Sequence, residues 1–85
     1  MYKLAYTKQA VRALQKMPAS TALLIREKLT LLAENPFGAH SNAKKLQGRP
    51  AYRLRVGDWR VIYEINKEEL HILVIKIAPR GEVYR

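Results

Sequence analysis

The chain has 85 residues, of which 48% are hydrophobic and 27% charged, so it can form one small globular domain but not a two-domain active site. Sixteen Lys and Arg against seven Asp and Glu give a net charge of +9 and a pI near 10.2, which favours a polyanion such as nucleic acid as partner. The absence of cysteine excludes disulfides and thiolate chemistry, and without a signal peptide or an apolar run of roughly 20 residues we expect a cytoplasmic protein with no membrane partner.

The first 34 residues predict a strand followed by a helical hairpin. Residues 2–6 alternate with a period of two, and Thr7 is a suitable N-cap for the helix that follows. Pro18 must end this helix, because proline lacks the amide hydrogen and disfavours a helical residue before it. A second helix then runs to about Glu34, with apolar residues at helical spacing, including Leu24 and Leu31 at the margin of its apolar stripe.

The second half of the chain predicts three antiparallel strands. Residues 35–50 indicate a loop with two prolines and two glycines. Residues 52–56 and 59–65 then alternate on either side of Gly57-Asp58, a two-residue hairpin turn, and residues 70–77 are apolar on both faces, as in a central strand. The order β-α-α-β-β-β predicts an α+β fold: an antiparallel sheet of about four strands with the N-terminal helical hairpin packed on one face.

The Gly57-Asp58 turn also predicts a register that gathers arginines. Arg55 faces Arg60 across the hairpin, and Arg53 lies on the same face of the sheet, opposite the apolar face that the helices cover. Arg80 follows the last strand and can reach this face. Such a face can be merely solvated, but a like-charge pair and the use of arginine throughout favour a surface that binds phosphate oxygens.

Three stretches of the sequence together resemble one toxin family. They are KLQG at residues 45–48, YRLRVGDWRVIY at 52–63 and IAPRGEVY at 77–84. They resemble the RelE branch of the RelE/ParE toxin superfamily, and the resemblance covers essentially the whole chain. It implies a single toxin domain over residues 1–85, a small twisted antiparallel sheet, and the activity of a ribosome-dependent mRNA endonuclease from a type II toxin–antitoxin system.

The resemblance also implies a set of catalytic residues. Arg53 and Arg55 match two alternating basic positions on the first hairpin strand, and Arg60 matches an arginine that contacts the scissile phosphate. Arg80 matches an arginine after the last long strand, and Tyr84 a tyrosine that stacks on a base. Well-studied members have lysines at the first two positions, one of them a proposed general base. Because arginine stays protonated, Arg55 is a poor base.

The expected chemistry is metal-independent attack of the RNA 2′-hydroxyl on the adjacent phosphate, with arginines stabilising the developing charge and no cofactor. Lys44 and Lys45 are candidates for binding RNA or ribosomal phosphates, although loop lysines are commonly just solvated. His40 and His71 are expected to be structural or solvated, with His71 facing Glu64 and far from the arginines.

The sequence is also compatible with two other functions. One is a non-catalytic ParE-like toxin that inhibits DNA gyrase, which the absence of the two lysines slightly favours. The other is a basic nucleic-acid-binding domain without toxicity. For a toxin we also expect a cognate acidic antitoxin, because a charge of +9 needs neutralising when the toxin is idle, and hence a toxin–antitoxin hetero-oligomer.

Overall fold

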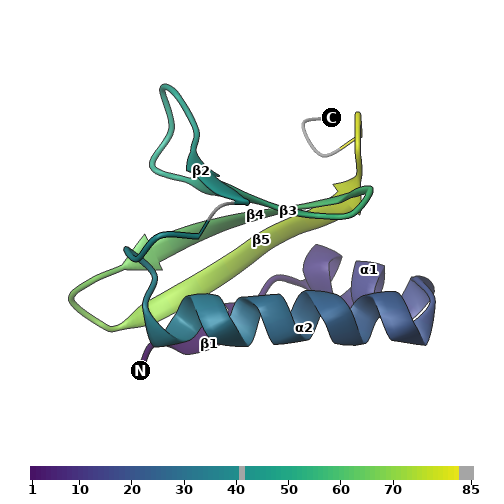
Figure 1. Cartoon of the computed structure of the whole chain (residues 1–85), viewed down its shortest axis with the longest axis horizontal. Helices are drawn as coiled ribbons and strands as arrows, with labels where there is room; N and C mark the ends of the chain where they lie inside the picture. The colour runs from purple at the N-terminus through teal and green to yellow at the C-terminus, as the bar shows by residue number, and fades with distance from the viewer. Residues whose placement is uncertain (41, 83–85) are drawn as a thin grey trace.

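A computed structural model of the chain describes residues 1–40 and 42–82, which form a five-stranded sheet with two helices on one of its faces (Figure 1). The predicted α+β fold is confirmed. The strand order is β1-β5-β4-β3-β2. In chain order the elements are β1 (Lys3–Tyr6), α1 (Lys8–Lys16), α2 (Ala19–Glu34), β2 (Ala43–Lys45), β3 (Tyr52–Val56), β4 (Trp59–Asn66) and β5 (His71–Pro79).

Two strands differ from the expected sheet. β2 lies within the segment that the sequence indicates as a loop, and it pairs antiparallel with β3. At the other edge, β1 runs parallel to β5, with Leu4 opposite Ile72, so the sheet is mixed. No short turn joins β1 to β5, because both helices and three strands intervene, and the chain therefore need not return antiparallel.

The start of α1 is tied to the edge of β5 that β1 leaves uncovered. The hydroxyl of Thr7 accepts a hydrogen bond from the Ala10 amide at 3.2 Å, the predicted N-cap, and donates one to the Ile75 carbonyl. The Gln9 side chain makes two bonds of 3.1 Å to Ile77, one to its amide and one to its carbonyl. Gln9 therefore takes the place of a neighbouring strand where β1 has ended.

The main core lies between the helices and the sheet. It joins the buried faces of α1 and α2 to alternate residues of β3, β4 and β5, and Tyr2, Leu4 and Tyr6 pack against it. The prediction that Leu24 and Leu31 widen the buried apolar stripe of α2 is wrong. Their side chains are 44% and 55% exposed, because the sheet covers a narrower face of the helix. No helix in the described ranges is both long and apolar enough to cross a membrane.

A second, smaller core lies on the face of the sheet that turns away from the helices, here called the outer face. Ile62 of β4, Ala78 of β5 and Ala51 are buried together, and Leu46 packs against them. The loop between β2 and β3 makes this possible, since the Leu46 amide bonds to the Ala51 carbonyl at 2.9 Å. The same loop rises from the outer face (Figure 1).

Candidate nucleic-acid interface

The β3–β4 hairpin has the register that the sequence predicts. Arg55 pairs with Arg60, Arg53 with Ile62, and Val56 with Trp59. Gly57 adopts a φ of 57°, the left-handed conformation that glycine reaches without strain and that the tight turn needs. Because side chains alternate across a strand, the three arginines project from the outer face, away from the helices.

The hairpin turn holds Arg60 and the start of the segment after β5. One guanidinium nitrogen of Arg60, Nη1, donates to the carbonyls of Gly57 and Trp59 at 2.8 and 2.9 Å. The backbone amide of Arg80 donates to the Asp58 carbonyl at 2.7 Å. The backbone of Arg80 therefore lies beside the hairpin turn, which also holds the Arg60 guanidinium.

The electrostatics of Arg60 show that these cations share one region. Desolvation by burial lowers the pKa of Arg60, and the charges of Arg55, Arg80 and Arg53 lower it further. The charge of Asp58 raises the pKa of Arg60, but its effect is the smallest of these. Since a guanidinium remains protonated in proteins, the cluster keeps its positive charge and attracts an anion instead of releasing a proton.

A small hollow of about 100 Å³ lies next to Arg55, lined by Asn42, Lys44, Arg53 and Arg55. Lys44 is opposite Arg53 in the β2–β3 register, and the Asn42 carbonyl accepts the Arg55 amide hydrogen at 2.9 Å. The Nε atom of Arg53 is buried and has no hydrogen-bond partner among the described residues. We call Lys44, Arg53, Arg55, Arg60 and Arg80 the arginine face.

Four of the five expected catalytic residues and one of the two lysines thus come together. Lys45 does not join them, because it pairs with Tyr52, whose ring lies on the helix side of the sheet. Tyr84 lies outside the described residues. Asn42 was not predicted: it lies in a segment whose composition indicates a loop, and no sequence signal places it beside the arginines.

The two histidines lie elsewhere. His40 Nε2 is 2.6 Å from the Asn35 carbonyl, at the end of α2. His71 Nδ1 lies 3.6 Å from a carboxylate oxygen of Glu69. The expected pairing of His71 with Glu64 is wrong: His71 lies opposite Asn66, because β4 continues through Asn66 and the turn to β5 occupies residues 67–70 instead of 66–69.

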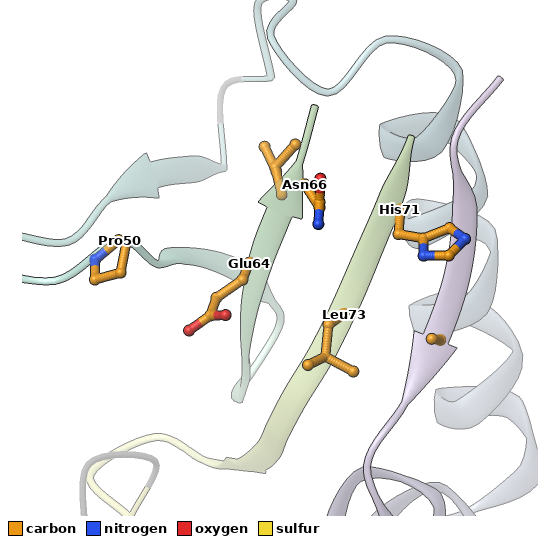
Figure 2. Close-up of a pocket in the computed structure, with 7 residues that line it drawn as sticks. Pro50, Glu64, Asn66, His71 and Leu73 are labelled. Atoms are coloured by element: carbon orange, nitrogen blue, oxygen red, sulfur yellow. The ribbon is translucent and has the colours of Figure 1, made fainter. Parts of the chain in front are cut away.

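A larger pocket of about 400 Å³ occupies another part of the outer face (Figure 2). Figure 2 shows Glu64 and Leu73 on neighbouring strands and Pro50 facing them from the loop before β3. Its lining contains no lysine or arginine, which separates it chemically from the arginine face. The lining residues are Ala5, Pro50, Glu64, Ile65, Asn66, His71 and Leu73.

Comparison with known proteins identifies a matching family and a relative. The family model of the ParE toxin of the type II toxin–antitoxin system parDE matches residues 4–84. A Methanocaldococcus jannaschii protein described as a toxin, RelE1, is 29% identical over an alignment of 80 residues, and the match covers 92% of this chain and 89% of that protein.

Solved structures match along nearly the whole chain as well. The archaeal RelE–RelB complex from Pyrococcus horikoshii OT3 contains a chain with 34% identity and a TM-score of 0.82, the match covering 95% of this chain and 97% of that one. The isolated E. coli RelE toxin matches with 26% identity and a TM-score of 0.81, over 99% of this chain and 92% of that one.

Proposed function

Because the chain belongs to the ParE toxin family of type II toxin–antitoxin systems, within which it is RelE-like, we propose that it is an endoribonuclease that cuts messenger RNA on the ribosome. The observation that carries this proposal is the arginine face. Arg55, Arg60 and Arg80 meet at the hairpin turn, and the Arg60 guanidinium is held there by two carbonyl bonds. Hydrogen-bond donors that are held in place before the reaction stabilise the negative charge that develops on the phosphate in the transition state.

In the proposed reaction the RNA supplies its own nucleophile, the 2′-hydroxyl group. The 2′-oxygen forms a bond to the adjacent phosphorus while the bond to the 5′-oxygen breaks, which leaves a 2′,3′-cyclic phosphate and a 5′-hydroxyl. One proton leaves the 2′-hydroxyl and one is delivered to the 5′-oxygen. Arg55, Arg60 and Arg80 stabilise the pentavalent phosphate, and Tyr84, as the resemblance implies, stacks on a base.

The direct test uses purified ribosomes programmed with a defined message. We expect the chain to cut the message in the A site, and to fail when the nucleotide on the 5′ side of the cut carries 2′-deoxyribose. Mapping of 5′ ends identifies the cut, and a cyclic phosphate on the upstream fragment identifies the nucleophile. Normal cutting of the deoxy message would disprove 2′-hydroxyl attack, and an intact ribose message would disprove the ribonuclease itself.

A second candidate is non-catalytic inhibition of DNA gyrase. Two observations favour it: the matching family model is that of ParE, and residues 53 and 55 are arginines, which cannot serve as general bases. Induction of the chain in cells separates the two functions. DNA breaks with intact messages would support the gyrase target, whereas cut messages with intact DNA support the ribonuclease.

We further infer a cognate acidic antitoxin that binds this toxin in a hetero-oligomer. Solved relatives include RelE–RelB complexes from Pyrococcus horikoshii and E. coli. In this chain α2 exposes Leu23, Leu24 and Leu31, an apolar surface that a partner can cover, and a charge of +9 favours an acidic one. Co-purification with the product of the adjacent gene tests this inference, and a chain that is non-toxic when produced alone would contradict it.

A further inference from the structure

The hollow beside Arg55 is lined by cations and by no acidic side chain from the part of the chain that the structure describes. Arg53, Arg55 and Lys44 bring three positive charges to it, and its fourth lining residue, Asn42, is neutral. The Arg53 Nε hydrogen is buried without an acceptor among the described residues, although buried polar atoms in proteins nearly always have a partner. The three charges that line the hollow are balanced by an anion such as a phosphate group, and not by a neutral water molecule.

The size and position of the hollow suit a backbone phosphate of RNA. Its volume of about 100 Å³ leaves room for a phosphate group but not for a nucleobase with its ribose. Arg53 and Arg55 are two residues apart on the same face of β3, so their Cα atoms are separated by about 6.6 Å. Successive phosphates of one RNA strand are separated by a similar distance.

Arg55 stands between this hollow and the hairpin turn. On the turn side it lies opposite Arg60, where the proposed function places the scissile phosphate. On the other side it lines the hollow with Arg53, which is opposite Lys44 and one row further from the turn. An RNA backbone that follows β3 therefore meets two rows of cations in succession.

We propose that the Asn42–Lys44–Arg53 hollow is a second phosphate subsite, which holds the phosphate next to the scissile one. The inference rests on the proposed function and deepens it, because it gives Arg53 a substrate-positioning role in place of a role at the scissile phosphate. The Arg53 guanidinium and the Lys44 ammonium bind this phosphate, and Asn42 lines the hollow beside them. The RNA backbone is thereby aligned along β3.

The test is single-turnover cleavage on programmed ribosomes, with one uncharged methylphosphonate placed in turn at each phosphate flanking the cut. For the unaltered chain we expect one flanking position at which the neutral group slows cleavage at least about tenfold. Arg53→Gln should slow cleavage of the normal message by a similar factor and should no longer respond to that methylphosphonate. Lys44→Gln, a change at an exposed side chain, should show the same loss of response if Arg53→Gln fails to fold.

Arg12→Gln, which removes an equal charge from the exposed face of α1, is the matched control and should respond as the unaltered chain does. Two results would overturn the subsite: no sensitive flanking position, or effects of Arg53→Gln and the methylphosphonate that multiply at every position. An unaltered chain that leaves all messages intact would instead overturn the proposed function.

A second measurement then decides the subsite by itself. In the arginine-¹⁵N-labelled chain, titration with inorganic phosphate should shift the Arg53 Nε–H resonance saturably, and more than that of Arg12. Equal shifts of the two resonances, or none at Arg53, would overturn the proposal.

Discussion

Arg60 has its guanidinium held before any RNA binds, by the carbonyls of Gly57 and Trp59. The nitrogens that do not make these bonds are available to the phosphate, and their contribution rises as charge develops. We therefore predict that Arg60→Ala or Arg80→Ala lowers the cleavage rate on ribosomes by at least about 10² while ribosome affinity changes little. Arg12→Ala, with the same loss of charge on α1, should cut normally. Normal cutting by Arg60→Ala would refute the assignment of the arginine face.

Tyr63 provides a prediction about stability that is independent of the function. It is 1% exposed and stacks on Tyr52 with ring centroids 5.4 Å apart. Burial raises the pKa of Tyr63 to about 12, and Tyr52 acts in the same direction. The folded state thus favours the neutral phenol, whereas in the unfolded chain a tyrosine ionises near pH 10.

The sign follows from these two pKa values. Below about pH 10 the Tyr63 contribution to the free energy of unfolding is fully present, and it is lost as the pH rises from about 10 to 12, by up to about 3 kcal/mol. Urea unfolding at about pH 8 and pH 11.5 measures this loss. Because other groups titrate in the same range, the quantity to compare is the difference between the unaltered chain and Tyr63→Phe. An equal loss in both proteins would contradict the prediction.

At the scale of elements, Gln9 joins α1 to the edge of β5 beyond the end of β1. Its amide both donates to and accepts from the backbone of Ile77. We predict that Gln9→Ala lowers the free energy of unfolding by about 0.5–1.5 kcal/mol, because water can replace part of this pairing at the sheet edge. Gln15→Ala, at an exposed position of the same helix, is the control and should change stability much less. Equal effects in urea unfolding would show that the edge is already well solvated.

The elements also show which parts of the fold can be predicted from sequence. A two-residue turn at Gly57-Asp58 leaves a single register for β3 and β4, so the pairing of Arg55 with Arg60 could be derived. β2 could not, because three residues are too few to show alternation. Its absence from the prediction hid the opposite orientations of Lys44 and Lys45, and with them the hollow beside Asn42.

Longer-range features had no local signal at all. The shift of register between Ile62 and Tyr63 leaves Ile75 of β5 without an opposite residue on β4, and nothing in the composition of β4 marks it. The parallel pairing of β1 depends on how the helices pack, not on a turn. The site was therefore predictable where the β3–β4 hairpin builds it, and not where β2 and Asn42 just before it complete it.

At the scale of the whole molecule, the outer face divides into two chemically different parts. Cations gather near the hairpin turn and β2, whereas the pocket in Figure 2 is lined by apolar and uncharged side chains, His71 and the carboxylate of Glu64. Ile62, Ala78 and Ala51 form the small core of this face. If the proposed function is correct, we expect the arginine face, and not the net charge of the whole surface, to supply most of the affinity for RNA.

This localisation predicts how RNA binding depends on salt. Five cations of the arginine face that each neutralise one phosphate give a slope of about −3.5 for the logarithm of the binding constant against the logarithm of salt concentration. Arg55→Gln together with Arg60→Gln should reduce the slope to about −2. Arg12→Gln with Lys16→Gln makes the same change in net charge on α1 and should leave the slope unchanged. Fluorescence anisotropy with a 2′-O-methyl oligouridylate, which lacks the nucleophile, measures both. Equal slopes for the two double variants would mean that the whole surface, and not the arginine face, attracts the RNA.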